Sequence, residues 1–149
     1  MNFAHVHLVL THFPPVLSLG GAFSAAAGVV RRRRDLVRLA LVLMVAVGAM
    51  MPLVYFAGDH AADSIGRVEG IQQDAIAPHL RAAKIALVIS VCTALIAAGV
   101  LIVEHRRGDL TRSLRVLTLA AAIACALPIG WTAALGGAIH HPEIYSQSP

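Results

Sequence analysis

The amino-acid sequence predicts an all-α fold, an integral membrane bundle of four helices that run up and down. The 149-residue chain is 58% hydrophobic and only 13% charged, with a mean hydropathy of +0.75. A soluble domain of this size could not bury so much apolar surface, whereas a bilayer can cover it. The charged residues fall in three bands between long uncharged runs, and the length allows a single domain, residues 1–149.

Four apolar runs are candidate membrane spans, at about residues 7–30, 36–57, 79–103 and 114–140. Each exceeds about 20 residues, which suffices for roughly 30 Å of hydrocarbon at about 1.5 Å per residue. Gly58 stands where it would terminate the second run. Pro14 and Pro15 lie near the start of the first run and predict a distorted turn at His12, with Phe13 pushed away from helical geometry.

The basic residues predict how the chain is oriented, because short cytoplasmic loops are rich in Lys and Arg. Nine arginines flank the loops after the first and third spans: Arg31, Arg32, Arg33, Arg34, Arg38, Arg106, Arg107, Arg112 and Arg115. Only Arg67, Arg81 and Lys84 flank the opposite side. We therefore expect a multi-pass protein of the bacterial inner membrane with both termini in the periplasm. The N-terminus lacks the basic region and cleavage site of a signal peptide, so the first span should be retained.

The segment between the second and third spans has an amphipathic pattern. Within residues 65–79, the apolar residues Val68, Ile71, Ala75 and Ile76 recur at roughly helical spacing. This pattern predicts a short amphipathic helix on the outer surface, beside the mouth of the bundle.

Seven of the eight histidines fall on the outer side: His5, His7, His12, His60, His79, His140 and His141. Counted from the cytoplasmic ends at about 1.5 Å per residue, each helix brings one histidine to a level of roughly 35–39 Å, and His12 lies at roughly 27 Å. Histidine is costly inside a membrane and there marks a functional site. Convergence from all four helices therefore predicts a shared site, whereas unrelated interfacial histidines are the simpler alternative.

Haem b is the cofactor that this pattern favours. Helical bundles build cofactor sites from side chains on facing helices, and two neutral imidazoles are a common axial pair for haem iron. Gly136 and Gly137 would leave room for a flat macrocycle. Arg81 and Lys84 could pair with haem propionates or extend to the membrane surface.

A copper or zinc site is the alternative, because imidazoles also bind these ions. It would draw on His12, His79, His141, His60 and His140. Mixed clusters with nearby carboxylates also fit this reading, formed by His60 with Asp59 and Asp63, or by His140 with His141 and Glu143.

Three motifs resemble a widespread family of small four-helix bacterial membrane proteins classed as a domain of unknown function. Its H-L-x-L-N-H-x-P opening is matched from His7 to Pro14, with Thr11 in place of asparagine. Its T-G-x-x-A-E-E block resembles residues 57–63, where the acidic pair is reduced to Ala62 and Asp63. Its L-G-G-x-I-R-H-x-E-I ending resembles residues 135–144, with histidine at 140 in place of arginine.

The resemblance implies four site positions: His7, His12, His79 and His141. His60 and His140 depart from the family pattern and rank lower as ligands. The family brings no established activity, so the functional expectation depends on the chemistry of the site.

We expect a haem-binding electron-transfer subunit that passes electrons between membrane quinol and a periplasmic cytochrome. A non-catalytic subunit of a larger respiratory or photosynthetic complex, or a copper- or zinc-binding membrane protein, are the alternatives. No nucleophile–base pair, phosphate-binding loop or nucleic-acid-binding motif is visible in the sequence. The absence of C-x-x-C-H excludes covalent attachment of c-type haem.

Overall fold

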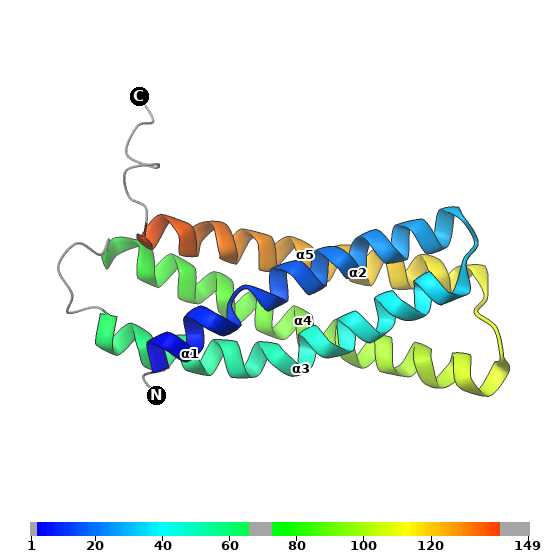
Figure 1. Cartoon of the computed structure of the whole chain (residues 1–149), viewed down its shortest axis with the longest axis horizontal. Coiled ribbons are helices and arrows are strands. Elements are labelled where there is room, and N and C mark those ends of the chain that lie inside the picture. Colours follow the sequence, from blue (N-terminus) through cyan, green and yellow to red (C-terminus); the bar gives the residue numbers. More distant parts are fainter. Residues whose placement is uncertain (1–2, 66–72, 141–149) are drawn as a thin grey trace, which may run out of the picture.

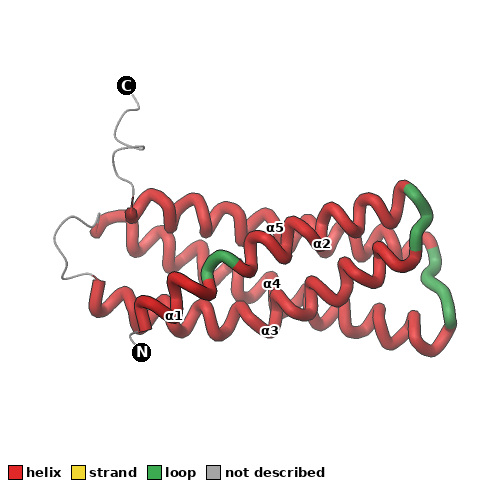
Figure 2. Tube along the Cα trace, in the orientation of Figure 1, coloured by secondary structure: helices red, strands yellow, loops and turns green. Residues whose placement is uncertain are grey.

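The computed structural model describes residues 3–65 and 73–140, which form an all-α bundle (Figure 1). Its helices are α1 (Phe3–Leu10), α2 (Phe13–Val30), α3 (Arg34–Ile65), α4 (Gln73–Arg107) and α5 (Arg112–His140). The described residues outside these helices form short turns (Figure 2). The predicted all-α four-helix architecture is therefore confirmed.

The long helices form a ring in which α2 packs on α3, α3 on α4, α4 on α5 and α5 on α2. α2 and α4 consequently occupy one diagonal of the bundle, and α3 and α5 the other. Four segments are long and apolar enough to cross a membrane: His7–Val30, Arg34–His60, Ile76–Arg107 and Arg112–Ile139. Their outward surfaces carry large apolar side chains, including Phe23 at 74% exposure, as a helix bundle surrounded by lipid would.

The first span is divided into two helices by a turn at Thr11 and His12. The sequence predicted this break, although Phe13 is the first residue of α2 and not a distorted residue before it. Pro14 and Pro15 therefore lie in the first turn of α2, where a missing N–H loses no helical partner. The break directs α1 away from the line of α2 and against α3 (Figure 1).

Two predicted boundaries between the second and third spans need correction. Gly58 does not terminate its helix, because α3 continues to Ile65. The short surface helix expected within residues 65–79 is not a separate element among the described residues: Ile65 ends α3, and Ile76 lies in the first turns of α4. The part of that segment at residues 66–72 lies outside the described residues.

Small side chains fill much of the bundle core. One cluster includes Ala25, Ala40 and Ala97, each fully buried, and a second surrounds Val47 and Cys125. Small residues allow close backbone approach, which is the usual basis of helix packing in membranes.

The arginine-rich turns meet at one end of the bundle around a buried carboxylate. Glu104 of α4 is 2% exposed, and its Oε1 accepts a hydrogen bond of 2.7 Å from Nε of Arg34. Arg38 lies 3.9 Å from the other carboxylate oxygen. The Arg34 guanidinium also donates to the carbonyl of Gly108 and so ties the two turns together.

Candidate functional site

A cavity of about 710 Å³ occupies the opposite end of the bundle, where the predicted histidine site should lie. We call it the histidine pocket. Side chains from all five helices line it, and most of them are apolar or small. The residues that carry its polar chemistry and shape are His7, Thr11, His12, Tyr55, Gly58, His79, Thr132, Gly136 and Gly137.

His7 enters the pocket from α1 and is held by α3. Its Nδ1 lies 3.0 Å from the carbonyl oxygen of Val54. A carbonyl can only accept a hydrogen bond, so Nδ1 is the protonated donor, and in a neutral imidazole Nε2 is then the nitrogen without a proton. The ring lies over Gly58, where a Cβ would come within 2.5 Å of its Cε1 atom.

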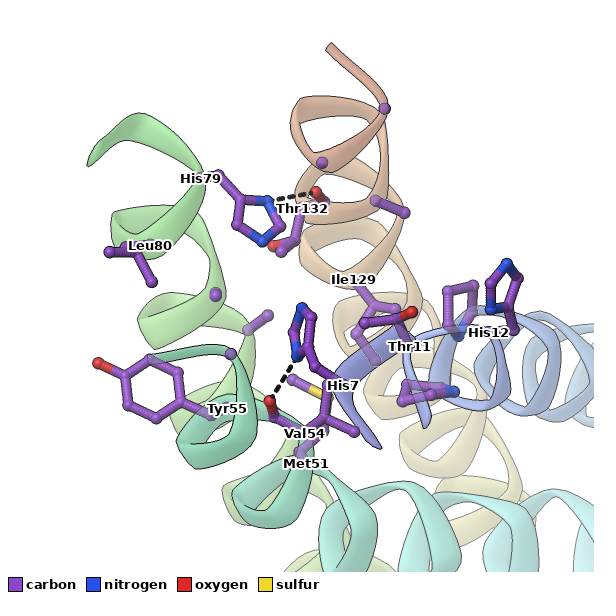
Figure 3. Close-up of a pocket in the computed structure, with 18 of the residues that line it drawn as sticks. His7, Thr11, His12, Met51, Val54, Tyr55, His79, Leu80, Ile129 and Thr132 are labelled. Atoms are coloured by element: carbon purple, nitrogen blue, oxygen red, sulfur yellow. Dashed lines mark hydrogen bonds between the residues drawn. The ribbon is translucent and has the colours of Figure 1, made fainter. Parts of the chain in front are cut away.

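His79 enters from α4 and is held by α5 in the same manner. Its Nδ1 lies 3.1 Å from the carbonyl oxygen of Thr132, which assigns the same tautomer. A Cβ at Gly136 would lie 3.1 Å from its Cε1 atom. Figure 3 shows the second ring nitrogens of His7 and His79 directed toward each other across the pocket. The two partly buried imidazoles therefore face a common space.

The remaining predicted histidines that the structure describes are placed differently. His12 is exposed at the edge of the pocket, and its Nδ1 donates over 2.9 Å to the carbonyl of Leu8 in the preceding helix. His60 is exposed, bonds the carbonyl of Phe56 in its own helix, and is not a lining residue. Of the predicted set, the structure thus directs His7 and His79 at one another.

Other predicted site residues lie outside the described side chains or outside the pocket lining. The side chain of His140 and all of His141 fall outside the described part of the chain, so their assignment stays a prediction. Arg81 and Lys84 are exposed on α4 and do not line the pocket. Their pairing with propionates also stays a prediction.

A metal site of three or more protein ligands is not formed by the side chains that the structure describes. Among them, no group of three or more His, Cys, Asp or Glu residues is close enough to share an ion. Zinc and copper sites usually need three or four such ligands. A metal site of that kind would therefore require at least one residue whose side chain is not described, such as His140, His141 or Asp63.

Part of the pocket lining reaches the flank of the bundle at the break between α1 and α2. Three of its lining residues there, Leu8, His12 and Val16, are exposed to the outside. At this break α1 packs on α3, whereas α2 packs on both α3 and α5 (Figure 1). These exposed lining residues belong to the first candidate span, His7–Val30.

Sequence reasoning missed Gly58 as a site residue and gave Gly136 only a general spacing role. Each glycine lies four residues after the residue whose carbonyl accepts the hydrogen bond from the imidazole, which is Val54 for Gly58 and Thr132 for Gly136. This i, i+4 relation places carbonyl and glycine on one helix face. A single glycine in the sequence is most simply interpreted as the end of a helix. Only the recurrence of glycine at equivalent positions in two helices, Gly58 and Gly136, could have indicated a role in the site.

Comparisons with protein-family models, curated proteins and solved structures found no match to this chain.

Proposed function

We propose that this chain is an electron-transfer subunit that binds b-type haem. It would be an integral protein of the bacterial inner membrane. The observation that carries the proposal is the pair of imidazoles at His7 and His79, both in the Nδ1–H tautomer with Nε2 facing the same pocket. A bound haem would supply a one-electron redox couple at this end of the bundle.

The donor set suits such a group. Ligating histidines characteristically donate their other ring N–H to a backbone carbonyl, which fixes the tautomer and strengthens the ligand. Here Val54 and Thr132 provide the two carbonyls. The cavity of about 710 Å³ lies within the range of roughly 300–1,000 Å³ typical of cofactor and ligand sites.

The walls of the pocket also favour a flat apolar group. Met51, Ile129 and Ala86 form part of its lining, while Gly58, Gly136 and Gly137 leave space beside the imidazoles. Apolar walls with a few placed polar groups are typical of cofactor pockets.

Electron exchange with membrane quinol is supported by the pocket-lining residues Leu8, His12 and Val16, which are exposed on the flank of the bundle. A lipid-soluble hydroquinone could reach the pocket edge from the bilayer, where Nε2 of His12 is a hydrogen-bond acceptor because Nδ1 is the donor. The arginine-rich end would face the cytoplasm, so the pocket would lie near the periplasm, within reach of a soluble cytochrome.

An absorbance spectrum of the protein, purified in mild detergent and supplied with haem, tests the proposal. We expect b-type Soret and alpha bands that sharpen on reduction with dithionite. Replacing His79 by alanine should abolish these bands, whereas His105→Ala, at the arginine-rich end, should leave them unchanged.

Two results would favour the alternatives. Stoichiometric copper or zinc in elemental analysis, with no haem bands, would favour a metal-binding protein. Co-purification with a large respiratory or photosynthetic complex, with no cofactor in this chain, would favour a non-catalytic subunit.

A further inference from the structure

The two halves of the chain share a residue pattern at a spacing of 72 positions. His7, Leu8, Val16, Ser18, Ala22, Ala25 and Ala26 are repeated as His79, Leu80, Val88, Ser90, Ala94, Ala97 and Ala98. The repeat therefore relates the α1–α2 span to α4, and it begins at the two histidines that face the pocket.

Burial follows the same spacing. The buried residues of α2 are Pro14, Ser18, Gly21, Ala25 and Gly28. The positions 72 residues later, Ala86, Ser90, Thr93, Ala97 and Val100, are all buried in α4. The two diagonal helices consequently turn equivalent faces toward the bundle axis.

The helices that hold the imidazoles are related in the same way, at a spacing of 78 positions. Leu36, Leu39, Leu41, Ala46 and Gly58 of α3 recur as Leu114, Leu117, Leu119, Ala124 and Gly136 of α5. Buried Ala40, Met44, Val47 and Met51 correspond to buried Thr118, Ala122, Cys125 and Ile129. The spacing is larger for α3 and α5 than for α2 and α4 because α4 has additional residues at the arginine-rich end, where it extends to Arg107.

The contacts at the pocket complete the correspondence. In each half, Nδ1 of the first helix's histidine donates to a carbonyl of the next long helix, over 3.0 Å at Val54 and 3.1 Å at Thr132. In each half, a glycine four residues after that carbonyl lies against the imidazole ring. Histidine, carbonyl and glycine thus form one unit that occurs twice.

We infer that the histidine pocket is made of two equivalent half-sites, produced by an internal repeat of a two-helix hairpin. On the basis of the proposed function, His7 and His79 would together hold one haem between the half-sites, each through its Nε2. Gly58 and Gly136 are positioning residues, because each leaves the space that its imidazole occupies. A pseudo-twofold axis along the bundle exchanges the two half-sites, since diagonal helices correspond.

Spectroscopy of the haem-supplied full-length protein tests the equivalence. We expect a low-spin, six-coordinate spectrum that is lost in both His7→Ala and His79→Ala. Gly58→Ala and Gly136→Ala should each weaken haem binding by about 10–100-fold, the usual effect of disturbing groups that orient a ligand. Gly99→Ala is the matched control, because nothing lies within 4 Å of an added Cβ there.

A second measurement judges the half-sites without haem. Nitrogen-15 NMR of the ligand-free protein should find both His7 and His79 in the Nδ1–H tautomer, and each glycine substitution should perturb its own histidine alone. A low-spin spectrum that survives His7→Ala, or an Nε2–H tautomer at either histidine, would overturn the equivalence. Failure of the wild-type protein to bind haem, with both tautomers as expected, would overturn the proposed function alone.

Discussion

Gly48 of α3 lies directly against Ala94 of α4, where the two helices pack on each other. A Cβ added at Gly48 would overlap the Cβ of Ala94 and come within 2.9 Å of the carbonyl oxygen of Ser90. One of these neighbours is a β-carbon and the other is a backbone oxygen, so neither can rotate away. The contact fixes how closely the two halves of the bundle meet.

Gly48→Ala should therefore destabilise the bundle, by about 1–3 kcal/mol, because the added methyl group forces the helices apart. Thermal unfolding in detergent, followed by circular dichroism, measures the loss. Gly99→Ala lies in the same pair of helices but meets open space. It should be neutral or stabilising by up to about 1 kcal/mol, since alanine is the better helix former. Equal stability of the two variants would contradict this interpretation.

The bundle itself could be predicted from the sequence because long apolar runs and arginine-rich turns are properties of single segments. The break at His12 was also predictable, because proline acts on its immediate neighbours. Gly58 was misassigned as a terminator for a physical reason: a local pattern gives the conformational freedom of a glycine but not what lies against it. Its role depends on His7, 51 positions earlier, which only the packing of α1 on α3 reveals.

The pairing of His7 with His79 was only partly predictable. Helix length gave both residues the same level, but the sequence gave similar levels to His60, which the structure turns outward. Rotation about the helix axis decides between them. The 72-residue repeat indicates this rotation. His7 and His79 occupy the same position relative to the buried face of α2 and of α4, respectively.

Glu104 should contribute to stability through its arginine partners. It is 2% exposed, and Glu104→Ala would leave Arg34 without its 2.7 Å acceptor and Arg38 without a nearby carboxylate. Because Arg34 is 44% exposed and can reach water, we expect a loss of about 1–3 kcal/mol, below the full cost of breaking a buried pair.

The matched control for this change is Asp109→Ala. The Asp109 side chain is 72% exposed, and its carboxylate is paired with Arg115. Because water reaches the Asp109 carboxylate, this pair should contribute less than the one at Glu104, so the unfolding temperature of Asp109→Ala should fall less than that of Glu104→Ala. The reverse order would show that the buried carboxylate is not a stabilising centre of this end.

The two cysteines should report on membrane insertion. Cys92 is exposed in the middle of α4, and Cys125 is buried, with its Sγ 3.7 Å from Oγ of Ser90. If lipid surrounds the bundle, a charged, membrane-impermeant thiol reagent should label neither residue in intact vesicles. A lipid-soluble maleimide should reach Cys92 after detergent extraction, while Cys125 should react only after denaturation. Rapid labelling of Cys92 by the charged reagent in vesicles would contradict a lipid-facing α4.

Reporter fusions should place the arginine-rich end in the cytoplasm. A fluorescent protein fused after Gly108, in the turn between α4 and α5, should be bright, and alkaline phosphatase at the same site should be inactive. The reason is the excess of arginine in the turns at this end, which resists translocation. A phosphatase fusion within residues 66–72 should be active, because α3 ends at Ile65 and α4 begins at Gln73, both at the opposite end of the bundle (Figure 1). Active phosphatase after Gly108 would place the histidine pocket near the cytoplasm and redirect any electron transfer through it to a cytoplasmic partner.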